Sequence, residues 1–332
     1  MATVTYSKNV FLPLTNACRN ECAYCGFRSA NPSIMEKRDV LSVLKSGRKA
    51  GCKEALFTFG ERPESDERIR KTLLGWGYSS VTEYLFDLCE DAIKLGLLPH
   101  TNAGALEKDE MNALKAVNAS MGLMLENASE RLCEKGMPHE KSPGKRPDVR
   151  LRTIENAGKL EIPFTTGLLI GIGETSKEVL DSIKKIKKRN DRYHHIQEVI
   201  VQNFKPKKGT PMEHRAEPTL LQMSDAVRAV RGVMPEMHIQ VPPNLNLDTW
   251  PELVSAGVND LGGISPTTKD YINPEAEWPD IQRLTSMAGK VDIALRERLA
   301  IYPEFIKRGW YSEGIGELIE RYTDAEGLVN ES

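Results

Sequence analysis

No long hydrophobic run occurs in this sequence of 332 residues. None of its segments approaches the roughly 18 consecutive apolar residues of a membrane-spanning helix, and residues 1–30 lack the layout of a signal peptide. An excess of charge of one sign is also missing, since the formal net charge is −2. We therefore expect a cytoplasmic protein with no nucleic-acid partner and no membrane partner.

The sequence also lacks a second CxxC or HxxxH pair, which a structural zinc site would need to complete its four ligands. It has six cysteines, and in a cytoplasmic protein these are better explained as thiols or metal ligands than as a disulfide framework. Three of them stand alone in helical or strand-end patterns, which favours buried, small hydrophobic side chains. These three are Cys52, Cys89 and Cys133.

Short apolar runs alternate with amphipathic helical patterns along the whole chain. The predicted strands are residues 9–14, 54–59, 98–102, 120–125, 163–170, 197–203, 238–241 and 257–261, and the helical patterns include residues 80–95, 108–117, 177–189 and 219–233. Eight strands separated by helices predict an α/β protein with a parallel sheet. They favour a (β/α)8 barrel of the TIM type, with a doubly wound open sheet as the alternative.

We expect one domain over residues 1–332, in which residues 280–332 form C-terminal helices packed on the barrel. The Gly- and Pro-rich stretch 136–147 is predicted to be a long functional loop. In a barrel, chemistry takes place on the loops that follow the carboxyl ends of the strands. Residues at predicted strand ends are therefore the candidates for a site.

The first predicted strand leads directly into Cys18, Cys22 and Cys25, in a CxxxCxxC spacing. Three thiolates this close together can hold three corners of one iron–sulfur cluster on a single loop. A 4Fe–4S cluster normally has four cysteine ligands, so three would leave one iron open to another molecule, as in a catalytic zinc site with an open position. Structural zinc and unremarkable thiols are the alternative interpretations.

This motif, with Tyr24 before its last cysteine, resembles the signature of the radical S-adenosylmethionine (SAM) superfamily. The resemblance implies a 4Fe–4S cluster on Cys18, Cys22 and Cys25, with SAM as the second cofactor. The amino and carboxylate groups of SAM are suited to chelate the open iron. The resemblance also implies that Tyr24 lies near the adenine.

Later strand ends resemble the SAM-binding motifs of the superfamily. Phe59-Gly60-Glu61 is similar to its Gly-Gly-Glu motif, which contacts the amino group of SAM, although Phe59 replaces the first glycine. The resemblance implies that Glu126 accepts hydrogen bonds from the ribose and that Arg131 pairs with the SAM carboxylate. The alternative is helix capping, by Glu61 itself and, after the fourth predicted strand, by Asn127 or Ser129.

The strand at 163–170 continues into Gly167-Leu-Leu-Ile-Gly171-Ile-Gly-Glu174, which resembles the GxIxGxxE pattern whose backbone lies against the adenine. Glycine lets a backbone approach a flat ring closely. A dinucleotide-binding fingerprint is a weak alternative, because Ser176 stands where its last glycine is needed. A phosphate-binding loop at residues 143–145 is excluded, because His139 occupies the position of its first glycine. Asn102 is a further candidate for cofactor binding.

A narrower resemblance is to the CofG-type subunits of 7,8-didemethyl-8-hydroxy-5-deazariboflavin (FO) synthase. Its most specific parts are residues 136–139 with 142–145, residues 196–204, and Asn259-Asp260 before Gly262-Gly263. The resemblance implies radical conversion of a 5-amino-5-(4-hydroxybenzyl)-6-(ribitylimino)-dihydrouracil adduct to FO with loss of ammonia. A CofH-type partner subunit would supply the adduct, and a reductant such as ferredoxin or flavodoxin would supply electrons.

Such a substrate is polar, so we expect hydrogen-bonding side chains at the barrel mouth. The candidates near predicted strand ends are His100, Asn102, Gln202, Asn203, Asn244, Asn246, Asn259 and Asp260. We single out Asn203 and Asp260 as catalytic candidates, together with His139 as a group for proton transfer. The alternative functions are another radical SAM enzyme of the same branch, either CofH-type or a menaquinone-pathway cyclase, and a non-catalytic iron–sulfur electron carrier.

Overall fold

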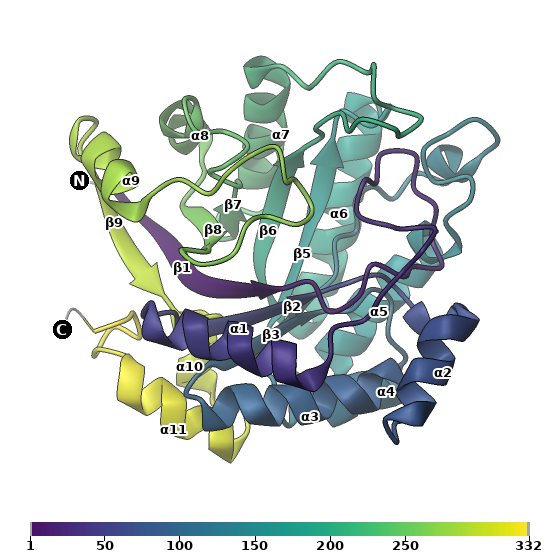
Figure 1. The fold of residues 1–332 in the computed structure, drawn as a ribbon. Coiled ribbons are helices and arrows are strands. Elements are labelled where there is room, and N and C mark those ends of the chain that lie inside the picture. The colour runs from purple at the N-terminus through teal and green to yellow at the C-terminus, as the bar shows by residue number, and fades with distance from the viewer. Residues whose placement is uncertain (1, 331–332) are drawn as a thin grey trace.

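Eight parallel strands form a closed barrel with helices around its outside (Figure 1). The computed structural model describes residues 2–330. The strands follow one another in chain order around the barrel, and β1 closes the ring because it pairs with both β8 and β2. The predicted (β/α)8 fold is therefore confirmed. The strands are β1 (Ala2–Leu12), β2 (Glu54–Thr58), β3 (Leu98–Asn102), β4 (Ser120–Gly122), β5 (Phe164–Ile170), β6 (Ile196–Asn203), β7 (His238–Gln240) and β8 (Asp260–Ile264).

The helices cover the outer face of the sheet with the apolar faces that their sequences predict. In the helix directly before β3, for example, the Ser80 side chain caps the first turn and the buried residues include Val81, Leu85 and Leu88. Among the described residues, no helix is both long and apolar enough to span a membrane. The α-helices are α1 (Lys37–Lys49), α2 (Glu67–Gly75), α3 (Val81–Lys94), α4 (Lys108–Lys115), α5 (Pro147–Lys159), α6 (Ser176–Tyr193), α7 (Leu220–Val233), α8 (Trp250–Ala256), α9 (Ile281–Gly289), α10 (Pro303–Arg308) and α11 (Glu313–Tyr322), and the short 3-10 turns are η1 (Pro63–Ser65), η2 (Glu130–Cys133) and η3 (Pro143–Lys145).

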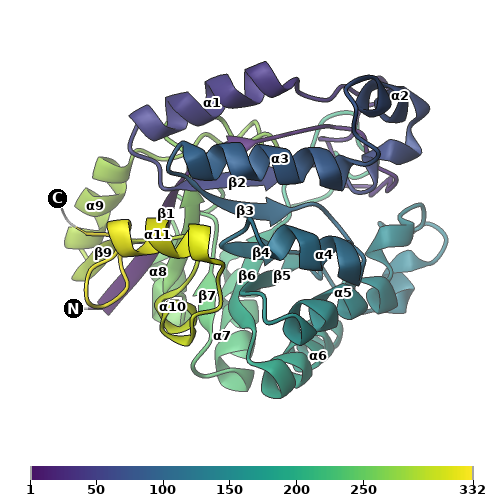
Figure 2. The same ribbon diagram turned by 90° about the horizontal axis from the view of Figure 1, so that it is seen from below.

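The C-terminal region contains a strand that the sequence pattern did not predict. We expected only helices after residue 279, but β9 (Ile293–Arg298) runs parallel to the first half of β1 (Figure 1). Three of its six residues are charged, so it shows neither an apolar run nor a clear alternation. After β9 the chain forms α10 and α11, and α11 contacts α3 on the outside of the barrel (Figure 2).

The eighth strand begins three residues later than predicted, at Asp260 instead of residue 257. Gly257 ends α8 with a φ of 127°, and Val258 and Asn259 connect it to the strand. Asn259 and Asp260 therefore lie where β8 begins, at the end of the barrel opposite the cysteine loop. The prediction that these two residues are at the barrel mouth is wrong.

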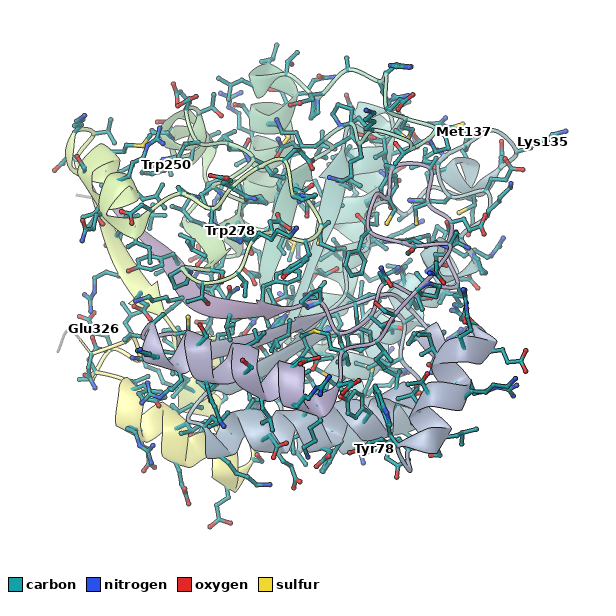
Figure 3. The ribbon with its side chains drawn as sticks, in the orientation of Figure 1. Tyr78, Lys135, Met137, Trp250, Trp278 and Glu326 are labelled. Atoms are coloured by element: carbon teal, nitrogen blue, oxygen red, sulfur yellow. The ribbon has the colours of Figure 1, made fainter. Side chains whose placement is uncertain are left out.

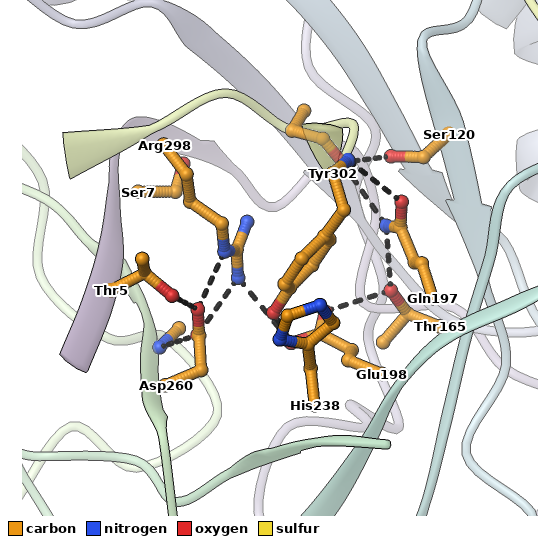
Figure 4. A network of polar contacts seen from close by, with 12 residues as sticks. Thr5, Ser7, Ser120, Thr165, Gln197, Glu198, His238, Asp260, Arg298 and Tyr302 are labelled. Carbon is orange, nitrogen blue, oxygen red and sulfur yellow. Dashed lines mark hydrogen bonds and ion pairs between the residues drawn. The ribbon is translucent and has the colours of Figure 1, made fainter. Parts of the chain in front are cut away.

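A buried polar network fills the barrel at the end where the strands begin (Figure 4). The guanidinium of Arg298 donates to both carboxylate oxygens of Asp260, at 2.6 and 2.9 Å, and to Glu198 at 3.3 Å. It also lies 4.1 Å from the ring centre of Tyr302, whose hydroxyl donates to Glu198 at 2.8 Å. Burial raises the pKa of Asp260, but Arg298 outweighs this and keeps that pKa below its ordinary value. Asp260 therefore belongs to this buried network, which we call the barrel floor, and not to a catalytic site.

Candidate active site

A cavity of about 350 Å³ opens at the carboxyl ends of the strands. All three cysteines of the CxxxCxxC motif line it, together with side chains from the ends of β2, β3 and β6. The loop between β8 and α9 (residues 265–280) contributes a further wall, which includes Trp278 (Figure 3). The cavity is therefore shared between the cysteine loop and the barrel interior.

The three thiols of this loop fit the ligand set of a 4Fe–4S cluster. Cys18, Cys22 and Cys25 are free and partly exposed, and the other three cysteines of the chain do not line the cavity. The backbone N–H groups of Glu61 and Asn20 donate to Sγ of Cys18 at 3.2 and 3.4 Å, which would stabilise a thiolate ligand. The described residues hold no group of three His, Cys, Asp or Glu side chains around one ion position. A cluster does not need such a group, because it carries each thiolate on a different iron.

Gly60 allows the cysteine loop to lie directly against the end of β2. A Cβ atom at this position would be 1.8 Å from the carbonyl oxygen of Ala17 and 2.8 Å from Cβ of Cys18. Two backbone hydrogen bonds fasten the contact, from Gly60 N–H to Thr15 and from Arg19 N–H to Glu61. The loop conformation thus depends on a residue without a side chain.

The carboxylate of Glu61 lies at the centre of a buried polar cluster on the cavity wall. It accepts hydrogen bonds from Arg19 at 2.8 Å, from the N–H of Ala105 at 2.9 Å and from Arg150 at 3.3 Å. Burial alone would raise the pKa of Glu61, but Arg150, the Ala105 N–H and Arg19 together lower it below its ordinary value. Glu61 is therefore ionised and fixed in position, and it lines the cavity.

Tyr24 lines the cavity, and His139 supports it from behind. The Tyr24 hydroxyl lies 3.0 Å from Nε2 of His139, and the two rings meet edge to face. His139 is 2% exposed and is not part of the cavity lining. Burial, with the charges of Lys145 and Arg150, lowers the pKa of His139 to about 3. The position of His139 outside the cavity lining, and the low pKa that makes it a weak base, both disagree with the predicted role in proton transfer.

The predicted carboxylate-binding arginine points away from the cavity. Arg131 pairs with Glu178 at 2.7 Å and donates to the carbonyl oxygen of Gly173 at 2.7 Å, and it does not line the cavity. The prediction that it faces the cofactor site is wrong. Arg150 on α5 has the expected place instead, since it is buried, lines the cavity and bonds to Glu61. Its sequence signal was an arginine on the apolar face of α5, one residue before the buried Leu151.

Glu126 lines the cavity and has an ion-pair partner that the sequence pattern did not predict. Its carboxylate pairs with Lys145, which belongs to the Gly- and Pro-rich stretch and also lines the cavity. Glu126 itself has a φ of 62° in a bridge to Leu168 of β5. This strained backbone conformation holds the carboxylate at the barrel mouth.

The glycine-rich segment after β5 acts mainly through its backbone. The carboxylate of Glu174 accepts from the N–H groups of Gly171 and Gly173 at 2.7 and 2.9 Å, which closes the turn. Neither Gly171 nor Glu174 lines the cavity, and a Cβ at Gly167 would lie 2.4 Å from the carbonyl oxygen of Ile200 on β6. Leu169, which lies between Gly167 and Gly171 in the sequence, is the residue of this segment that lines the cavity.

The remaining polar candidates are divided between the cavity and its surroundings. Asn102, Gln202 and Asn203 line the cavity, and so does Gly60. The amide of Asn203 is held by the carbonyl oxygen of Leu245 at 3.2 Å and by Asn246 at 3.0 Å. The candidates that do not line the cavity are His100, Asn244 and Asn246, in addition to Asn259 and Asp260, which lie at the opposite end of the barrel.

Comparison with known proteins gives consistent results at the level of sequence and of fold. A profile described as the Radical SAM superfamily matches residues 12–186. A 7,8-didemethyl-8-hydroxy-5-deazariboflavin synthase of Methanopyrus kandleri is 51% identical over 98% of this chain and 99% of its own length. One of the same name from Archaeoglobus fulgidus is 54% identical over 99% of each chain.

Solved structures with the same barrel include the FeFe-hydrogenase maturase HydG from Carboxydothermus hydrogenoformans. It superposes with a TM-score of 0.73 at 18% identity and covers 96% of this chain and 78% of its own. Methylornithine synthase (PylB) superposes with a TM-score of 0.69 at 18% identity, covering 88% of this chain and 83% of its own. At this identity the similarity concerns the fold.

Proposed function

Because the chain belongs to the radical SAM superfamily, and within it to the 7,8-didemethyl-8-hydroxy-5-deazariboflavin (FO) synthases, we propose that it closes the deazaflavin ring of FO. The proposed substrate is the 5-amino-5-(4-hydroxybenzyl)-6-(ribitylimino)-dihydrouracil adduct, supplied by a CofH-type partner subunit. Loss of ammonia during ring closure makes the reaction a carbon–nitrogen lyase step. The observation that carries this proposal is the nearly full-length similarity to synthases of this name.

We propose that Cys18, Cys22 and Cys25 hold a 4Fe–4S cluster whose fourth iron lacks a cysteine ligand. When bound, the cluster and SAM supply one-electron chemistry that removes a hydrogen atom from the substrate, with electrons from a donor such as ferredoxin or flavodoxin. Gly60 and Glu61 hold the cysteine loop in place through the contacts described above. This support is what would keep three thiols on one side of the cavity.

The charged groups of the wall provide a binding site for the amino-acid end of SAM. Arg150 and Lys145 place positive charge near the cysteine loop, and Glu61 places a negative charge beside it. This arrangement matches the carboxylate and ammonium groups of SAM. We propose that Tyr24 and Leu169 contact the adenine, that Glu126 accepts from the ribose, and that Asn102 lies beside the cofactor.

The rest of the cavity is the proposed substrate chamber. Gln202 and Asn203 contribute amides from the end of β6, and the β8–α9 loop contributes Trp278. We propose that Asn203 positions the substrate, since Leu245 and Asn246 fix its amide. We assign His139 to orienting the Tyr24 ring, because it contacts that ring and does not reach the cavity.

The test uses protein purified and reconstituted with iron and sulfide without oxygen. With SAM, dithionite and the adduct, it is expected to form 5′-deoxyadenosine, detected by mass spectrometry, and FO, detected by fluorescence. Cys18→Ala should form neither, whereas Cys133→Ala, which changes a thiol outside the cavity, should form both. If tyrosine and 5-amino-6-ribitylaminouracil are consumed instead of the adduct, the chain is a CofH-type enzyme.

A further inference from the structure

Two adjacent glycines on β8 leave room inside the barrel for two side-chain amides. A Cβ atom at Gly262 would lie 2.1 Å from Nε2 of Gln240, and one at Gly263 would lie 2.1 Å from Nδ2 of Asn9. Gly262 also has a φ of 70°, a conformation that side chains disfavour. The glycine pair therefore permits Asn9 from β1 and Gln240 from β7 to flank β8 within the barrel.

Gln240 lies at the floor of the cavity, and Asn9 lies directly beneath that floor. Gln240 and Gly263 line it directly, and so does Phe11, which is two residues after Asn9 and so on the same face of β1. Below Asn9 on that face is Ser7, which already belongs to the buried network of the barrel floor. Asn9 thus occupies the layer between the cavity and the charged network.

Asn9 is unusual because neither atom of its amide has a partner. Its side chain is 0% exposed, and both Nδ2 and Oδ1 lack a hydrogen bond within the described part of the chain. Buried amides are almost always hydrogen-bonded, and an unpaired one destabilises the folded state. Asn203, in contrast, is satisfied by its neighbours. An unpaired amide directly beneath a cavity whose wall there is glycine indicates a ligand that completes its hydrogen bonds.

We propose that Asn9 and Gln240 bind the imide edge of a pyrimidinedione ring, an inference that rests on the proposed function. This edge presents one N–H between two carbonyl oxygens. The Asn9 carbonyl can accept from the N–H while its NH2 donates to one ring carbonyl, and Gln240 can donate to the other. Leu56, Ile200 and Leu261 add apolar side chains to the cavity lining. Unpaired amides in such a site would discriminate strongly against rings that lack this pattern.

FO itself is a suitable probe, because it keeps the imide edge, fluoresces and needs no turnover to bind. Its N3-methyl derivative lacks the N–H and carries a methyl group at the proposed contact. Four reconstituted proteins are titrated with each compound: wild type, Asn9→Leu, Gln240→Met and Gln282→Met. The last is the control, because Gln282 is exposed at the start of α9. Wild type and Gln282→Met should bind FO roughly ten- to a hundredfold more tightly than the two cavity variants do. All four proteins should bind N3-methyl FO weakly.

Thermal unfolding separates this role from a structural one. Asn9→Leu replaces an unpaired buried amide with an apolar group of similar size, so its stability should stay equal to that of wild type or increase. The proposal is overturned if both cavity variants bind FO as wild type does, or if wild type binds FO no better than N3-methyl FO. If FO binding depends on Asn9 but the adduct is not converted, only the proposed function is refuted. If both variants form FO with an unchanged KM for the adduct, only the imide site is refuted.

Discussion

Replacement of Gly60 with alanine should disconnect the cysteine loop from β2. The new Cβ would lie 1.8 Å from the carbonyl oxygen of Ala17, whereas real Cβ contacts are essentially never below 3.0 Å. The loop backbone must therefore move by about 1.2 Å, which is typical of overpacking that destabilises a protein by about 1–3 kcal/mol. Because Cys18 follows Ala17 directly, the displacement should separate its thiol from those of Cys22 and Cys25.

The assay compares Gly60→Ala with Gly232→Ala after the same anaerobic reconstitution. A Cβ at Gly232, near the end of α7, has nothing within 4 Å, and alanine there should stabilise the helix by up to about 1 kcal/mol. We expect Gly60→Ala to hold much less iron per chain and to form little 5′-deoxyadenosine, while Gly232→Ala equals wild type in both. Full iron content together with full SAM cleavage in Gly60→Ala would show that the cysteine loop does not depend on a glycine at this position.

Three further predictions concern the charged groups. Arg298→Met leaves two buried carboxylates without their cation and should lower the free energy of unfolding by about 3–5 kcal/mol in urea titration; a loss below 1 kcal/mol would contradict this. Burial raises the pKa of Glu54 to about 7, so the folded protein binds this proton more tightly than the unfolded chain. Stability should then fall as pH rises toward and through 7, and Glu54→Gln should flatten that profile in melting experiments. Arg150→Met should raise the SAM concentration needed for cleavage at least tenfold, whereas Arg131→Met should leave it unchanged. If Arg131→Met raises it and Arg150→Met does not, Arg131 pairs with the SAM carboxylate, as the sequence predicted.

The barrel and the cysteine loop could be predicted because both depend on local patterns. The strand predicted at residues 98–102 coincides with β3. The cysteine loop follows β1 directly, and its three cysteines lie together on the cavity wall. The Gly-Gly-Glu-like motif also lies beside this loop, since Gly60 is in contact with Ala17. Apolar runs and close cysteine spacing carry this information without knowledge of distant contacts.

Features that depend on distant partners could not be predicted in the same way. Arg298 is a buried charge within β9, and its place in a strand is explained by its contacts with Asp260 of β8 and Glu198 of β6. Arg131 and Arg150 follow the same strand, but the choice between them depends on Glu178 and Glu61, which lie 47 and 89 residues away. Single-sequence patterns contain no signal for such pairings.

The most direct test of the account is the ratio of two products in one reaction. Reconstituted protein, SAM, reductant and the adduct are incubated without oxygen, and FO and 5′-deoxyadenosine are quantified at successive times. If the chain closes the deazaflavin ring by radical chemistry, the two products should increase in a constant ratio, and FO formation should stop when SAM is omitted. Release of 5′-deoxyadenosine from the intact cluster enzyme with no FO, although the adduct is present, would contradict it.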